Sequence, residues 1–199
     1  MNSSNAVDDL LSNIRNCALC QENLPFGPRP VLRASASARI LIVGQAPGSR
    51  VHASGVPWDD ASGERLRRWL GLGPELFYDE SQIAIVPMGF CYPGRGKSGD
   101  LPPRPECAAT WHPLLIPLLT SVRFTLLVGQ YAQRHFLGDA AGSTLTETVA
   151  DWRCYWPRYA VLPHPSPRNQ LWLKRHPWFE QDCVPAIRER VHAVLAGAD

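Results

Sequence analysis

The chain has 199 residues, of which 45% are hydrophobic and 19% charged, a balance that suits one globular domain with a sizeable core. Its longest apolar runs are far too short to cross a bilayer, and the polar, acidic residues 1–11 lack the features of a secretory signal. The net charge of +2 does not by itself indicate a nucleic-acid-binding protein. We therefore expect a single domain over residues 1–199, a monomer, located in the cytoplasm and without a membrane partner.

Short apolar runs alternate with helical patterns along the chain. In chain order the predicted elements are a helix over residues 7–17, a loop over 25–30, a strand over 38–43, a helix over 63–70, a strand over 82–86, a loop over 89–105, a helix over 106–119, a strand over 123–128, helices over 131–137 and 144–151, a strand over 159–162 and a helix over 179–195. Either Asp60 or Ser62 can cap the second helix. Four apolar strands between helices predict a three-layer α/β/α fold around a central, mainly parallel four-stranded sheet.

Two of the loops that follow predicted strands carry unusual motifs. The loop after the first strand reads GQAPG from Gly44, and GVPW follows from Gly55 to Trp58. The loop after the fourth strand reads HPSPRN from His164 to Asn169. Ligands of parallel sheets bind beyond the carboxyl ends of the strands, so these two loops are expected to form one site.

These loops resemble the two active-site motifs of the uracil-DNA glycosylase superfamily. The first is similar to the iron–sulfur class of bacterial and archaeal enzymes, whose pattern is Gly-Glu-Ala-Pro-Gly followed by Gly-x-Pro-Phe. The second is similar to the His-Pro-Ser-Pro-Arg-Asn of the single-strand-selective monofunctional enzymes. The resemblance runs from about Cys17 to the C-terminus. It implies a monofunctional DNA glycosylase that hydrolyses the N-glycosidic bond of uracil or another deaminated base in single- or double-stranded DNA, as part of base-excision repair.

Residues of the first motif are expected to hold an extruded base. Gly44 lets the backbone approach the base closely, and the amides after the strand can donate hydrogen bonds. The resemblance implies that Gly44, Ala46, Trp58 and Pro87 line the base site. An aromatic partner for a flipped base contributes roughly 1–3 kcal/mol, and Trp58 stands where the iron–sulfur class has Phe. The alternative is that Trp58 is a residue of the core.

Residues of the second motif are expected to act on the leaving group and the DNA. His164 can donate a hydrogen bond to the base oxygen that gains charge, which is typically worth ~3 kcal/mol. The resemblance implies that Ser166 contacts a phosphate and that Pro167 and Arg168 form a wedge in the duplex, with Asn169 also at the DNA. A structural histidine and a surface arginine are the alternatives for His164 and Arg168.

Six cysteines in a chain without an export signal raise the prospect of a metal centre rather than disulfides. Four of them resemble the ligand set of the iron–sulfur class in spacing, and thiolates in that number suit a [4Fe–4S] cluster or, alternatively, a tetrahedral zinc ion. A redox pair is less expected, because no thioredoxin-like unit surrounds the first two. The remaining two, Cys154 and Cys183, are expected to be ordinary buried residues. The expected ligands are Cys17, Cys20, Cys91 and Cys107.

The chain departs from the family pattern at three positions. Gln45 replaces the Glu of the iron–sulfur class, Ala46 stands where other relatives have Asp or Asn, and Pro87 falls where relatives carry an Asn that reads uracil. With His164, Gln45 is the catalytic candidate of the two loops. It is also the first substitute base reader, because its amide both donates and accepts hydrogen bonds, ahead of the Met88 backbone and Tyr92. We expect weaker activity on uracil and a relaxed or shifted base preference.

The missing carboxylate keeps three functional classes open. Asp59, Asp60 and Glu64 are the nearest carboxylates in the first loop, and one of them could take over the positioning of water, although a helix cap is the better-founded role for Asp60. A working glycosylase is the first class. A protein that grips damaged or single-stranded DNA without cleaving it is the second, and a metal-holding protein that reuses the fold is the third.

Overall fold

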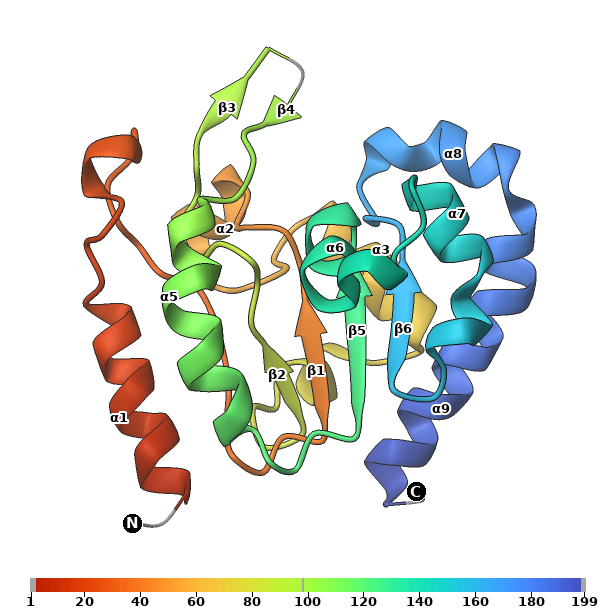
Figure 1. Ribbon diagram of the computed structural model, residues 1–199, viewed down its shortest axis with the longest axis horizontal. Helices are drawn as coiled ribbons and strands as arrows, with labels where there is room; N and C mark the ends of the chain where they lie inside the picture. Colours follow the sequence, from red (N-terminus) through yellow and green to blue (C-terminus); the bar gives the residue numbers. More distant parts are fainter. Residues whose placement is uncertain (1–2, 98, 198–199) are drawn as a thin grey trace.

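A parallel four-stranded sheet runs through the middle of the computed structural model, which describes residues 3–97 and 99–197 (Figure 1). Its strands are β1 (Ile40–Val43), β2 (Ile83–Ile85), β5 (Phe124–Val128) and β6 (Tyr159–Leu162). They are ordered β2-β1-β5-β6, and every neighbouring pair is parallel. The predicted three-layer α/β/α fold is confirmed, with a sheet that is parallel throughout rather than mainly so.

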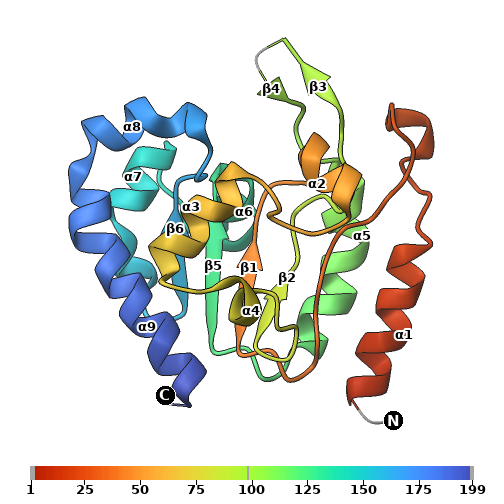
Figure 2. The same cartoon turned by 180° about the vertical axis from the view of Figure 1, so that it is seen from behind.

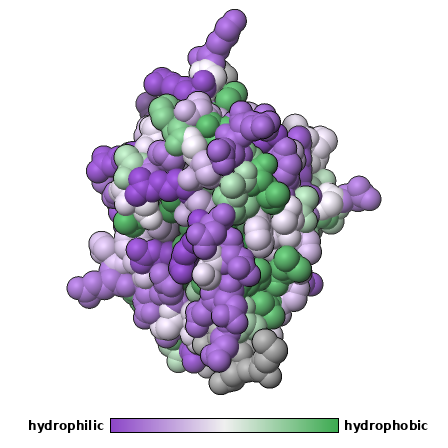
Figure 3. Space-filling view, turned by 90° about the vertical axis from the view of Figure 1, so that its left-hand side faces the viewer, coloured by the Kyte–Doolittle hydropathy of each residue, from purple (hydrophilic) through white to green (hydrophobic). Residues whose placement is uncertain are grey.

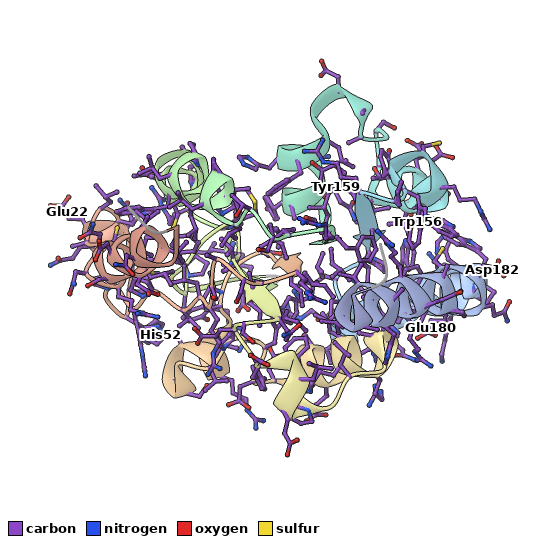
Figure 4. All side chains as sticks on the ribbon, turned by 90° about the horizontal axis from the view of Figure 1, so that it is seen from below. Glu22, His52, Trp156, Tyr159, Glu180 and Asp182 are labelled. Carbon is purple, nitrogen blue, oxygen red and sulfur yellow. The ribbon has the colours of Figure 1, made fainter. Side chains whose placement is uncertain are left out.

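Helices cover both faces of this sheet. The α-helices of the described residues are α1 (Ser3–Arg15), α2 (Ser49–Ser54), α3 (Ala61–Leu70), α4 (Pro74–Phe77), α5 (Pro105–Leu115), α6 (Gln130–Leu137), α7 (Leu145–Ala150), α8 (Gln170–Arg175) and α9 (Val184–Ala196). Helices α5, α6 and α7 lie on one face, while α3, α4 and α9 lie on the other (Figure 2). The view from below shows the same two layers on either side of the strands (Figure 4). No helix in the described ranges is long and apolar enough to cross a membrane.

The strands form where the chain is apolar on both sides of the pleat. All residues of β1, β2 and β5 are buried, as a sheet covered on both faces requires. In register, Ile40 of β1 lies between Ile83 of β2 and Phe124 of β5. These side chains fill the space between the helical layers. The carboxyl ends of β1 and β6 therefore lie at the same edge of the sheet, separated only by β5.

Caps and prolines set the helix boundaries. The Asp60 side chain accepts a hydrogen bond from the Gly63 amide at 2.9 Å, so Asp60 rather than Ser62 caps α3. Helix α5 starts with Pro105 in its first turn and tolerates Pro113, but it ends at Leu115 and continues as a 3₁₀ turn. The predicted helix over 106–119 is therefore shorter than expected, because the prolines remove amide donors from its second half.

The loop predicted over residues 89–105 contains a small antiparallel hairpin, formed by β3 (Arg95–Gly96) and β4 (Gly99–Asp100). It projects from the end of the molecule at which the parallel strands finish (Figure 1), and its tip is hydrophilic (Figure 3). Helices α2, α4 and α8 were also not predicted. Each has six residues or fewer, too short to show a helical period.

Candidate active site

A cavity of about 420 Å³ opens beyond the carboxyl ends of the parallel strands. Its volume suits a small-molecule or single-base ligand. The walls come from the loops after β1, β2 and β6 and from the hairpin, so the cavity joins segments far apart in sequence. Its lining residues include Gly44, Gln45, Ala46, Gly48, Trp58, Asp60, Pro87, Pro93, Asp100, Leu101, His164, Ser166, Arg168 and Asn169.

Trp58 forms part of this cavity in a constrained backbone conformation. Its φ of 58° makes it the one non-glycine residue with positive φ in the described part of the chain, a conformation that costs about 1–3 kcal/mol and clusters at functional sites. Its carbonyl accepts hydrogen bonds from Arg67 and from the Tyr78 hydroxyl, each at 3.4 Å. The two interpretations of Trp58 therefore combine, because the side chain packs against the core and also lines the cavity.

Two glycines make room for Trp58. A β-carbon on Gly63 would lie 1.8 Å from the Trp58 carbonyl oxygen, so only glycine fits in this turn of α3. A β-carbon on Gly44 would lie 2.8 Å from Cζ2 of the indole. The indole thus lies directly on the backbone at the end of β1, where the sequence motif places a base.

His164 follows β6 and faces Trp58, with 5.5 Å between ring centroids and an angle of 31° between the rings. Burial lowers the pKa of His164, against the opposing effect of the Asp60 and Asp100 carboxylates. Its imidazole is therefore neutral at pH 7 and keeps one N–H donor. In the described structure its ring nitrogens make no hydrogen bond, which leaves that donor available to a ligand.

The backbone around His164 is fixed by its own loop and by α3. The Asn169 side-chain amide donates to the His164 carbonyl at 2.8 Å. Arg65 of α3 donates to the Ser166 carbonyl at 3.2 Å and to the side-chain oxygen of Gln170 at 2.8 Å. The Ser166 hydroxyl accepts from the amide of residue 168 at 3.2 Å. These bonds position His164, so Asn169 and Ser166 have structural partners in addition to any DNA contact.

Arg168 extends across the cavity to the hairpin. Its Nη1 lies 1.8 Å from the position that a β-carbon on Gly99 would take, so the guanidinium packs directly against the Gly99 backbone. Pro167 is exposed and, unlike Ser166 and Arg168 on either side of it, lies outside the cavity lining. The structure thus brings nine of the ten residues predicted for the base and DNA sites to one cavity and leaves Pro167 beside it.

The loop after β2 is bonded to the loop after β1. The Met88 amide donates to the Gly44 carbonyl and the Gly89 amide to the Gln45 carbonyl, both at 2.9 Å. The Pro87 carbonyl accepts from Nε2 of the buried His112 at 3.0 Å. The Met88 amide is therefore already used. Among the three substitute base readers, Gln45 is the one that lines the cavity.

Sequence reasoning missed the contribution of the hairpin. Asp100 and Leu101 line the cavity, although they lie in a segment that was predicted to be an irregular loop. The buried Tyr92 donates its hydroxyl to Asp100 Oδ1 at 3.4 Å instead of lining the base site. Asp100 lies 42 or more residues from every motif residue of the first loop. The one available signal was a carboxylate within a Gly-rich turn.

A second, apolar cavity holds the other predicted set of residues. Cys17, Cys20, Cys91 and Cys107 all line it, together with side chains such as Leu24, Phe90 and Trp111. All four are free thiols. The Phe90 amide donates to the sulfur of Cys107 at 3.2 Å. Residues 17 and 20 thus meet residues 91 and 107, as the resemblance to the iron–sulfur class implies.

Thiol protonation at this cavity follows burial. Burial, with smaller contributions from the other three thiols, raises the pKa of Cys107 to about 12. Burial likewise raises the pKa of Cys91 and of Cys20. Without a cation, therefore, Cys20, Cys91 and Cys107 are neutral at pH 7.

The described residues include no group of three or more His, Cys, Asp or Glu side chains placed to hold a single metal ion. The chemistry of four thiols is nevertheless that of the donor set of a tetrahedral zinc ion or of a [4Fe–4S] cluster. Of the other cysteines, Cys183 is buried as expected. The expectation for Cys154 is wrong, because it lies exposed in a 3₁₀ turn at the surface.

Comparison with known protein families gives a match that covers both motif loops. The sequence matches the Uracil DNA glycosylase superfamily over residues 33–188. The matched region begins before β1 and extends into α9, so it includes all four strands of the parallel sheet and both motif loops. The activity associated with this family is the hydrolytic excision of bases from DNA. The chain belongs to the uracil-DNA glycosylase superfamily.

Proposed function

We propose that this protein is a monofunctional DNA glycosylase that hydrolyses the N-glycosidic bond of uracil or another deaminated base in DNA. It works as a single-domain monomer. The observation that carries the proposal is that a neutral His164 and the Trp58 ring lie side by side in the wall of one cavity that has room for a base. Family membership supports DNA as the partner and base excision as the type of reaction.

The first step is capture of the base. A base inside a duplex is out of reach, so it must be extruded at a cost of a few kcal/mol, least for a mismatched or single-stranded base. In the cavity it stacks on Trp58, which contributes about 1–3 kcal/mol. The close contact of the indole with Gly44 fixes the plane of stacking. The constrained backbone of Trp58 thus holds the indole ring in the position in which the base stacks on it.

The second step is departure of the base. As the bond between C1′ and the base nitrogen breaks, its electron pair stays on the base and charge spreads to a carbonyl oxygen. The free N–H of His164 donates to that oxygen. Because the imidazole is already neutral, it stabilises the leaving anion without first losing a proton. A preorganised donor of this kind is worth about 3 kcal/mol.

The remaining motif residues serve the DNA and the choice of base. Arg168, at the mouth of the cavity, and the exposed Pro167 beside it are placed to contact the strand from which the base is extruded. Ser166 and Asn169 hold that loop in shape and add phosphate contacts. Gln45 reads the edge of the base, since its amide can pair with both a donor and an acceptor.

We also propose that the four cysteines hold a [4Fe–4S] cluster, with zinc as the alternative. Four thiols in an apolar cavity, one of them already accepting an amide hydrogen bond, suit a cluster. Such a centre would tie the segment after α1 to the loop after β2 and so support Pro87 and its neighbours. Metal and sulfide analysis of anaerobically purified protein tests this. Iron, sulfide and a broad visible band are expected; stoichiometric zinc or four freely alkylated thiols without metal would contradict it.

A second candidate function is binding of damaged or single-stranded DNA without cleavage. One observation favours it: the positions where relatives place a carboxylate or Asn in the first loop are Gln45 and Ala46. An abasic-site assay separates the two functions. Oligonucleotides carrying uracil, hypoxanthine or xanthine, single- and double-stranded, are incubated with excess protein. Strand breaks after alkali treatment support the glycosylase, while gel-shifted but intact oligonucleotides support the binding protein. If neither strand breaks nor a gel shift is observed, the remaining function is that of a metal-holding protein of other purpose.

A further inference from the structure

Two carboxylates converge on Gly48 at the wall of the main cavity. A β-carbon on Gly48 would lie 3.5 Å from Asp100 Oδ2 and 3.9 Å from Asp60 Oδ2. Both residues line the cavity. The charges of both carboxylates raise the pKa of His164, against the larger lowering effect of burial. Although the first loop lacks its usual carboxylate, the folded cavity contains two.

The two carboxylates differ in their hydrogen bonds and in their exposure to solvent. Asp60 caps α3 with Oδ1, and this bond to the Gly63 amide fixes its side chain. Asp100 is exposed at the mouth, and the one hydrogen bond that its side chain accepts from the described residues is the longer one, of 3.4 Å, from the Tyr92 hydroxyl to Oδ1. Water can therefore reach Asp100 directly, and protons can leave it to solvent.

Asp100 is nevertheless held in place. The hairpin pairs Arg95 with Asp100, and the Leu101 amide donates to the Gly94 carbonyl at 2.9 Å. Just before Asp100, the buried Gly99 packs under the guanidinium of Arg168. The hairpin and the loop that carries His164 thus fix the backbone at Asp100, and the Tyr92 hydroxyl contacts its carboxylate, which is the support a catalytic group requires.

We propose that Asp100 is the catalytic carboxylate that orients and deprotonates the attacking water, a role that rests on the glycosylase function proposed above. The bond from C1′ to the base nitrogen breaks, and the base leaves with the electron pair beside His164. Water oxygen bonds to C1′, and its proton passes to Asp100. That proton is released to solvent, and the base anion takes up a proton. The products are an abasic sugar and the free base.

Matched amide substitutions test this assignment. We expect Asp100→Asn to lower the single-turnover rate of base excision by about 10²- to 10⁴-fold, the usual contribution of a general base. Asp60→Asn removes the same charge from the same cavity but keeps a good helix cap, so we expect less than a tenfold loss. Asp139→Asn, at an exposed turn remote from the cavity, is the control and should be unchanged.

Chemical rescue adds a readout that a structural role would not give. Asp100→Ala leaves space at an exposed position, so added formate should restore much of its rate, whereas chloride at equal concentration should not. Suppose that the wild type excises a base. An Asp100→Asn variant with an unchanged rate, or an Asp60→Asn variant that loses activity instead, then overturns the role of Asp100 and leaves the proposed function standing. Failure of formate to raise the rate of Asp100→Ala also counts against the role of Asp100. A wild type that excises no base from the panel overturns the proposed function, and this inference with it.

Discussion

The contact between Gly44 and Trp58 predicts the effect of one added methyl group. The β-carbon of Gly44→Ala would lie 2.8 Å from Cζ2 of the indole. Ordinary carbon contacts begin near ~3.5 Å, so the ring must retreat by roughly 0.7 Å. Gly44 lies outside the left-handed region of φ, so the substitution adds no backbone strain. The perturbation therefore falls on the position of the ring.

Displacement of the ring should slow excision more than it destabilises the fold. The Trp58 carbonyl is held by Arg67 and Tyr78, so the ring moves while its backbone stays. A misplacement approaching 1 Å can cost on the order of 10²-fold in rate, so we expect Gly44→Ala to lower the single-turnover rate by about 10- to 100-fold. The melting temperature should change little, because the ring borders an open cavity.

A double-mutant cycle decides whether the ring carries this effect. Trp58→Phe removes the outer indole atoms that a methyl group at position 44 would strike. In the Trp58→Phe background, Gly44→Ala should therefore cost less than about threefold, which corresponds to a coupling energy on the order of 1–2 kcal/mol. Equal losses in the two backgrounds, or no loss in the wild type, would refute the role assigned to this contact.

Three further predictions follow from the same cavity. His164→Ala should slow excision by ~100-fold or more while DNA binding persists, and a near-normal rate for the variant would contradict the role of His164. Because burial lowers the pKa of His164, the wild-type rate should not fall as pH rises through 6.5. Gln45→Ala should change the ranking of bases in a panel of uracil, hypoxanthine and xanthine, and strict uracil excision untouched by it would exclude Gln45 as the reader. Gly63→Ala places a methyl group 1.8 Å from the Trp58 carbonyl oxygen, so denaturant titration should show a loss of about 3 kcal/mol in unfolding free energy, and an unchanged midpoint would argue against this packing.

The parallel sheet could be predicted because its strands are apolar on both faces. The strand over 159–162 has the predicted bounds, and the other three differ by one or two residues at their ends. The boundaries of α3 and α7 also follow from local chemistry, since Asp60 and Thr144 provide caps. Short helices such as α2 could not be predicted, because tertiary contacts rather than a hydrophobic period stabilise them.

Some residues of the site could also be predicted from the sequence, and others could not. Gly44, Trp58 and His164 could be placed because motif loops at the ends of parallel strands meet at one edge of the sheet. Asp100 could not, because its position depends on a hairpin of two-residue strands and on the packing of Arg168 against Gly99. The meeting of the four cysteines was implied by family resemblance. The spacing of residues in the chain does not determine which loops approach one another.

The central claim is that this cavity releases a base from DNA, and the released base can be identified directly. Deaminated DNA is incubated with wild-type protein or with His164→Ala, and free bases are quantified by mass spectrometry alongside abasic sites. The account predicts that the wild type releases at least one deaminated base, with an equal number of abasic sites, and that His164→Ala releases about 100-fold less in the same time. Absence of any released base at equimolar wild-type protein, despite tight DNA binding, would contradict the account.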